Sequence, residues 1–113
     1  MHELSIAQEI VEIVRDNLPK TFKKVKQVKV KVGALGGILP DSLKFCFETI
    51  VSETDLDGAK MEIINVPIKI KCLDCKKESI IDNHYFVCSN CKSINVEIIE
   101  GRELNLVEIE IED

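Results

Sequence analysis

The sequence has no excess of positive charge. Its 113 residues include fifteen lysines and arginines against twenty aspartates and glutamates, which gives a formal net charge of −5. Proteins that bind nucleic acid by neutralising phosphates carry the opposite balance. The composition therefore argues against nucleic acid as the partner of the chain as a whole.

The sequence also lacks a long apolar run. No stretch of about 18 apolar residues is present, and acidic residues interrupt the N-terminal apolar segment from Glu3 onward, unlike a signal peptide. We therefore expect a cytoplasmic protein without a membrane anchor. With 45% hydrophobic residues, the chain can bury one core and carry a small appendage.

Two segments have the period of an amphipathic helix. In residues 4–18 apolar side chains recur at three- and four-residue spacing, Ser5 and Gln8 match a capping box at the start, and Pro19 ends the helix. A second helix is predicted to begin at Pro40. Its apolar face consists of Leu43, Cys46, Phe47, Ile50 and Val51, so Cys46 is interpreted as a core residue.

Alternating patterns predict three strands. Residues 28–32 alternate valine with lysine, and residues 107–112 alternate apolar residues with glutamate. Opposite charges on neighbouring strands stabilise a sheet by about 0.2–1 kcal/mol per pair, so we expect these two strands to be adjacent. A third strand covers residues 61–70, and its change of phase at Ile63 and Ile64 predicts a bulge.

This pairing makes the chain's middle an insertion. The strand over residues 107–112 pairs with the strand over residues 28–32. The chain between them leaves this sheet along one strand and returns to it along another. We therefore predict an α/β domain of residues 1–66 plus 100–113, and an inserted lobe of residues 67–99. The fold class is α+β, with two helices packed on a small three-stranded mixed sheet and an inserted lobe, which the two C-x2-C pairs at residues 72–75 and 88–91 make a zinc ribbon.

The four cysteines of the inserted lobe have the spacing of a metal site. Cys72-x2-Cys75 and Cys88-x2-Cys91 are separated by twelve residues. Each C-x2-C turn presents two thiolates, and two such turns supply the corners of a tetrahedron around Zn²⁺. With little apolar content of its own, the lobe needs the ion to fold. Four thiolates leave no position for water, so the zinc is structural and the chain is not an enzyme.

Other readings of these cysteines remain open at the level of sequence. Two disulfides, a thioredoxin-like redox pair and a rubredoxin-type iron centre use related spacings. A reducing compartment disfavours disulfides, and the thioredoxin motif belongs to a βαβ context that is absent here. Tetrahedral sulfur coordination suits iron as well as zinc.

The two histidines lie outside the cysteine set. If Met1 is retained, its α-amine forms one short chelate with the backbone nitrogen and imidazole of His2. Nitrogen-rich planar coordination points to Ni(II) or Cu(II). The plane then needs a further ligand, for which Glu3, Asp41, His84 or a partner protein are candidates. The alternatives are that His2 is an idle terminal residue and His84 an exposed hairpin residue without a metal.

Four segments together resemble the HypA family of hydrogenase-maturation nickel metallochaperones. They are MHELS at the start, VKVGALGGILPDSLKFCFE, the paired C-x2-C lobe, and GRELNLVEIEIE near the end, so the resemblance spans nearly the whole chain. It implies a nickel site at Met1, His2 and Glu3, and a structural zinc site at Cys72, Cys75, Cys88 and Cys91. The second knuckle carries Ser89, Asn90 and Lys92 where family members often have a histidine, which argues against a histidine-dependent rearrangement of the zinc site.

The resemblance also implies a function and partners. The chain is expected to bind Ni(II) at its N-terminus and deliver it during maturation of [NiFe]-hydrogenase. The expected partners are the GTPase HypB, the hydrogenase large subunit and, in some lineages, urease maturation proteins. The alternative is a zinc-ribbon module that binds nucleic acid or a large assembly, because residues 67–95 contain five lysines against three acids. Only Tyr85 and Phe86 offer rings for base stacking there.

Overall fold

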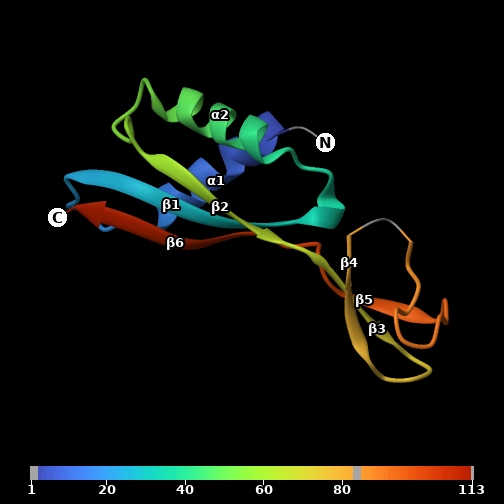
Figure 1. Ribbon diagram of the computed structural model, residues 1–113. Helices are drawn as coiled ribbons and strands as arrows, with labels where there is room; N and C mark the ends of the chain where they lie inside the picture. Colours follow the sequence, from blue (N-terminus) through green and yellow to red (C-terminus); the bar gives the residue numbers. More distant parts are fainter. Residues whose placement is uncertain (1–2, 83–84, 113) are drawn as a thin grey trace.

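The computed structural model describes residues 3–82 and 85–112, in an elongated molecule of 54 × 24 × 16 Å (Figure 1). No helix in this described part is long and apolar enough to span a membrane. The elements, in chain order, are α1 (Glu3–Asn17), β1 (Lys24–Gly33), the 3-10 turn η1 (Ala34–Gly36), α2 (Pro40–Val51), β2 (Lys60–Val66), β3 (Ile68–Cys72), β4 (Glu78–Ile81), β5 (Val96–Glu100) and β6 (Leu104–Glu112).

The first sheet has the order β2-β1-β6 and is mixed, because β1 runs parallel to β2 and antiparallel to β6. Both helices cover one face of it (Figure 1). Val28, Val30 and Val32 are buried beneath them, in a core shared with α1 and α2. Strands β4, β3 and β5 form a second, antiparallel sheet in the lobe. The predicted fold class is confirmed.

The lysine-faced and glutamate-faced strands are adjacent, as predicted. Lys29 pairs with Glu108 across the sheet, and its Nζ lies 3.3 Å from a carboxylate oxygen of Glu108 and 3.6 Å from one of Glu62. The hydrogen bond to Glu108 is the main reason that the pKa of Lys29 is raised. Because these charged groups face solvent, their ion pairs add little to the stability of the sheet. Their main effect is to favour the pairing of β1 with β6.

No bulge lies at Ile63 and Ile64, where one was predicted; the register shifts instead at Lys26 of β1, in β6 and at Ile99 of β5. The pairing of β1 with β2 continues without a shift from residue 60 to residue 66. Of the residues that follow the change of phase, Ile64 is exposed on β2, whereas Ile68 and Ile70 are buried on β3 of the second sheet, which the chain enters after Pro67. In β6, Glu108 pairs with Lys29 and Leu106 with Val30, which leaves Val107 as the extra residue. Leu106 therefore takes the core position predicted for Val107.

Helix α1 begins earlier than the sequence pattern indicated. Glu3 is already helical, so Ser5 lies inside the helix and the predicted capping box of Ser5 and Gln8 is wrong. The helix ends at Asn17, two residues before Pro19, as expected. Ile13 was predicted on the apolar stripe, yet it is 46% exposed.

The two sheets meet where Gly33 of β1 touches Gly101 of the returning chain. A Cβ on Gly33 would lie 2.1 Å from the Gly101 carbonyl oxygen, so no side chain fits there. That oxygen accepts a hydrogen bond from the Leu35 N–H at 2.9 Å, and the Gly101 N–H donates to Oε1 of Glu103 at 2.8 Å. Gly101 has a φ of 123°, which favours glycine. The division of the chain into an α/β domain of residues 1–66 plus 100–113 and an inserted lobe of residues 67–99 stays a prediction.

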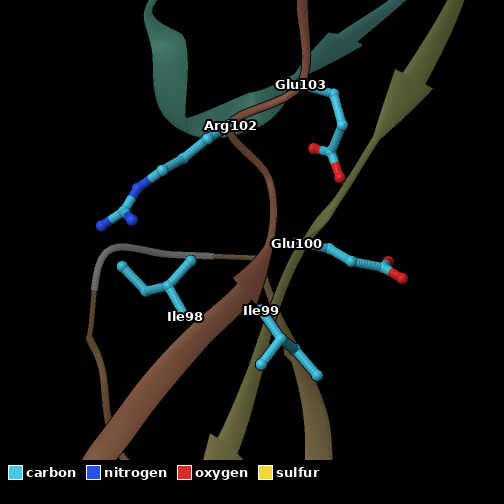
Figure 2. Close-up of a pocket in the computed structure, with 5 residues that line it drawn as sticks. All are labelled: Ile98, Ile99, Glu100, Arg102 and Glu103. Carbon is cyan, nitrogen blue, oxygen red and sulfur yellow. The ribbon is translucent and has the colours of Figure 1, made fainter.

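A cleft of about 290 Å³ lies beside this junction (Figure 2). Figure 2 shows Arg102 and Glu103 pointing to opposite sides of the returning segment. The residues that line the cleft are Ile98, Ile99, Glu100, Arg102 and Glu103. They belong to the end of β5 and the connection to β6, so the cleft follows from the way the chain crosses between the sheets.

Substitution of Gly33 by alanine should destabilise the protein. The new methyl group would overlap backbone atoms of Gly101 and Arg102, which cannot move without opening the junction, and we expect a loss of about 2 kcal/mol in the free energy of unfolding. Gly36→Ala is the matched control, because a Cβ there meets only the end of the Ile38 side chain, at 3.7 Å. Urea unfolding of both variants tests the contact, and equal midpoints would contradict it.

Candidate metal centre

Four cysteine sulfurs converge in the lobe. The Sγ atoms of Cys72, Cys75, Cys88 and Cys91 all lie within 4.8 Å of one another. The closest pairs join the two knuckles, at 3.5 Å for Cys72 and Cys91 and 3.6 Å for Cys75 and Cys88. A tetrahedron with metal–sulfur bonds of about 2.3 Å has edges of about 3.8 Å. The sulfurs therefore fit a four-coordinate metal ion.

The cysteines form no disulfides in this arrangement. All five are free thiols, which contradicts the two-disulfide alternative. The fifth, Cys46, is half-buried on α2, packed against the core of the first sheet and outside the sulfur cluster. Its predicted role as a core residue agrees with this position.

The two knuckles have the same backbone geometry. In the first, the Lys76 N–H donates to the Cys72 carbonyl at 3.0 Å; in the second, the Lys92 N–H donates to the Cys88 carbonyl at 3.0 Å. Both lysines adopt the left-handed conformation, with φ of 66° and 65°. This tight turn directs the two sulfurs of each knuckle to the same side.

Backbone N–H groups within the knuckles favour three of the thiolates. The Cys75 N–H donates to the Cys72 sulfur and the Cys91 N–H to the Cys88 sulfur, both at 3.4 Å, and these bonds lower the pKa of Cys72 and Cys88. The Lys77 N–H, followed by the side-chain amide of Asn90, lowers the pKa of Cys75. Three sulfurs are thereby prepared as anionic ligands.

Cys91 holds the last proton of the cluster. The Ser93 N–H favours its thiolate, but the neighbouring Cys72 sulfur and desolvation outweigh it, and together with the remaining sulfurs they raise the pKa of Cys91 to about 12. Four negative charges at this separation repel one another strongly unless a cation lies between them. A metal ion that binds here displaces this proton.

A polar network outside the cluster ties one knuckle to the other. Asp74, between the two cysteines of the first knuckle, accepts hydrogen bonds from the hydroxyl of Ser93 and from the side-chain amide of Asn95. The main chain adds a bond of 2.9 Å from the Leu73 N–H to the Asn95 carbonyl. Ser93 and then Asn95 lower the pKa of Asp74. The network fixes the separation of the knuckles from outside the sulfur cluster.

The predicted nickel ligands are only partly covered by the structure. Met1, His2 and His84 lie outside the described residues. Glu3 opens α1, and its Oε2 accepts a hydrogen bond of 3.2 Å from the N–H of Leu39, just before α2. Asp41 is exposed in the first turn of α2, two residues after Leu39. The start of α1 is thus attached to the residue that precedes α2, whose first turn carries Asp41.

Several residues of the centre were not identified from the sequence. They are the polar network of Asp74, Ser93 and Asn95, the amide of Asn90, and the left-handed Lys76 and Lys92. The sequence contained one indication of the two left-handed residues, because a lysine follows the second cysteine of each knuckle. The hydrogen bonds of the network join residues that are separated by 19 and by 21 positions in the sequence, so no local sequence pattern predicts them.

Comparison with known proteins gives a consistent result over the whole chain. Residues 1–111 match the family model described as hydrogenase/urease nickel incorporation, metallochaperone, hypA. Hydrogenase maturation factor HypA of Desulfatibacillum aliphaticivorans is 45% identical over 100% of this chain and 88% of its own length. HypA of Trichodesmium erythraeum is 38% identical over 100% of this chain and 97% of its own.

Solved structures agree with this assignment. The solution structure of the Ni metallochaperone HypA from Helicobacter pylori is similar with a TM-score of 0.68 and 26% sequence identity, over 99% of this chain and 98% of that one. A second solution structure, of a HypA protein, gives a TM-score of 0.70 over 98% of this chain. With the family model matching nearly every residue, this chain belongs to the HypA family of nickel-incorporating metallochaperones.

Proposed function

We propose that this chain binds Ni(II) at its N-terminus and delivers it during [NiFe]-hydrogenase maturation, while a structural Zn²⁺ holds the lobe. The observation that carries the proposal is the family match over residues 1–111, which includes the Met-His-Glu start. The chain acts by ligand exchange and catalyses no reaction. The relatives are named hydrogenase maturation factors, which supports a hydrogenase as the receiving enzyme, and the family resemblance implies its large subunit.

Zinc is the ion that suits the lobe. All four donors are cysteine sulfurs, which soft and borderline metal ions prefer, and two of the cysteines are fully buried. Among the described residues of the lobe, only Ile68 and Ile70 join Cys72 and Cys88 as buried apolar residues. So small a core does not stabilise a fold without cross-links or a metal.

Loss of one cysteine ligand should therefore remove the zinc and unfold the lobe. We expect Cys72→Ser and Cys91→Ser each to lose the bound ion on dialysis against a chelator, because three sulfurs no longer close the coordination sphere. Cys46→Ala is the control and should keep the full zinc content. Metal analysis by mass spectrometry measures zinc and also separates it from iron. Full zinc in both serine variants would refute the assignment.

The nickel site depends on the chain end that precedes α1. The Met1 amine, the His2 nitrogens and Glu3 make a nitrogen-rich set of the kind that Ni(II) prefers. The Glu3 carboxylate is bonded to Leu39, so that the chelate starts from a fixed point of the fold. Asp41 and His84 are the chain's candidates for a completing ligand.

Nickel binding should require both the His2 imidazole and a free amine. His2→Ala, N-terminal acetylation and a short N-terminal tag should each abolish Ni(II) binding while zinc content and fold are retained. Binding should also weaken as the pH falls through about 6.5, where an unperturbed imidazole takes up the competing proton. Calorimetry with Ni(II) on the zinc-loaded proteins measures this. Equal affinity in the tagged protein would exclude the amine as a ligand.

The nickel-binding end is also the proposed contact for the companion GTPase HypB. Leu4 and Leu39 are 52% and 62% exposed, and they adjoin the hydrogen bond between Glu3 and Leu39. Exposed apolar side chains beside a transferable metal provide a docking surface. A partner that covers them can bring its own ligands to the nickel.

Hydrogen exchange on the complex with the GTPase tests this contact. We expect protection of amides in residues 1–15, because the start of α1 is buried by the partner. The free zinc-loaded chain is the reference. Protection confined to the zinc lobe would contradict the proposed surface and leave the nickel ligands to be judged by calorimetry alone.

A further inference from the structure

A shallow groove of about 250 Å³ runs between α1 and the outer edge of β6. Strand β6 is at the edge of its sheet: one side pairs with β1, and no strand in the described part of the chain lies along the other. The groove is lined by Ile13, Asn17, Leu106, Val107, Glu108 and Ile109. Backbone hydrogen-bonding groups and apolar side chains are therefore accessible side by side.

The apolar lining comes from two elements and is open to solvent. Ile13 projects from α1 and is 46% exposed, and Val107, the extra residue of the β6 bulge, is 43% exposed. Neither belongs to the core under the helices. Large apolar side chains that face one groove from opposite sides are typical of a site that a partner covers.

The rim of the groove is negatively charged. Glu9 and Asp16 lie one turn before and one turn after Ile13, on the same side of α1. Both are exposed, as is Glu110 on β6, whose pairing with Gln27 places it on the sheet face away from the helices, and none of the three forms an ion pair with a described residue. The single basic residue of α1, Arg15, is bonded to Asp55 at 2.8 Å.

We propose that this groove binds an extended segment of a partner protein in which apolar and basic residues alternate. The segment adds a strand to β6, so that main-chain hydrogen bonds provide affinity and alternate side chains provide specificity. Its apolar residues enter the groove beside Ile13 and Val107. Its lysines or arginines, on the other face of the added strand, lie beside the carboxylates of Glu108 and Glu110, while Glu9 and Asp16 add negative charge on the α1 side of the groove.

The charge pattern disfavours a second copy of this chain as the occupant. Two β6 strands paired antiparallel would bring glutamates 108, 110 and 112 of one copy against those of the other, and like charges opposite each other destabilise a sheet. Charges and a bulge guard edge strands against unselective pairing. Here the same features leave the edge available to a strand of positive charge. The proposal is independent of nickel, because the groove contains none of the proposed nickel ligands.

Peptide binding to the zinc-loaded full chain tests the proposal. The probe is a short blocked peptide in which lysine and valine alternate, and its control is a peptide in which glutamate and valine alternate. We expect the first to shift amide resonances of residues 9–17 and 104–112, and the second to bind nowhere. The double variant Glu110→Lys plus Glu112→Lys should weaken binding about tenfold, measured by fluorescence anisotropy.

A matched variant separates the groove from net charge. Glu53→Lys plus Glu97→Lys makes the same change in charge at two exposed acids outside the groove, and should alter the affinity less than about twofold. Equal weakening by both double variants, resonance shifts confined to the zinc lobe, or no binding of the basic peptide would each overturn the proposal. A dimer formed through β6 without peptide would overturn it as well, by assigning the groove to a second copy.

Discussion

The architecture depends on a contact between two backbones that leaves no room for a side chain. Gly33 ends β1 at the point where Gly101 brings the chain back from the lobe, and a Cβ on Gly33 would overlap the Gly101 carbonyl. The outgoing connection, at Pro67, passes between the same two sheets. Both crossings are therefore held at one place, and the orientation of the lobe is set by main-chain geometry.

The loop that follows Gly33 extends this constraint to the start of the chain. Its Leu35 N–H is bonded to Gly101, and its Leu39 N–H is bonded to the Glu3 carboxylate. Residues 33–39 are thus hydrogen-bonded both to the chain that returns from the lobe, at Gly101, and to the first turn of α1, at Glu3. The proposed nickel site at the N-terminus would therefore adjoin, at Glu3, the same loop that contacts the chain returning from the lobe.

The two halves are stabilised by different physical effects. Under the helices, burial of aliphatic side chains from α1, α2 and the sheet supplies the free energy, at about 25 cal/mol per Å² of apolar surface. In the lobe, two isoleucines and two cysteines are the buried apolar residues among those described. Ligation by four thiolates, with an apparent free energy of about 10–16 kcal/mol for structural zinc, is of the size needed to compensate.

Sequence patterns predicted the features that depend on local spacing. The convergence of the four cysteines followed from two C-x2-C turns, and the pairing of β1 with β6 from their opposite charges. The prediction of a capping box at Ser5 and Gln8 was wrong because the same two residues also occur, at the same spacing, inside helices. The bulge was assigned to the wrong strand because register depends on a partner strand distant in sequence. The Gly33–Gly101 contact and the Asp74–Ser93 bond are equally long-range, and no periodicity encodes them.

Donor chemistry explains how one small chain can keep two metal ions apart. The lobe offers only sulfur, in a closed tetrahedron whose thiolates accept N–H bonds from the knuckles and whose spacing is fixed by Asp74. The proposed N-terminal chelate would offer mainly nitrogen and would be incomplete by itself. A metal ion exchanges slowly where every coordination position is occupied by a ligand that surrounding hydrogen bonds hold in place. It exchanges fast where one position is open to a ligand from a partner protein. On the proposed assignment, nickel can therefore leave from the open site while zinc stays in the closed one.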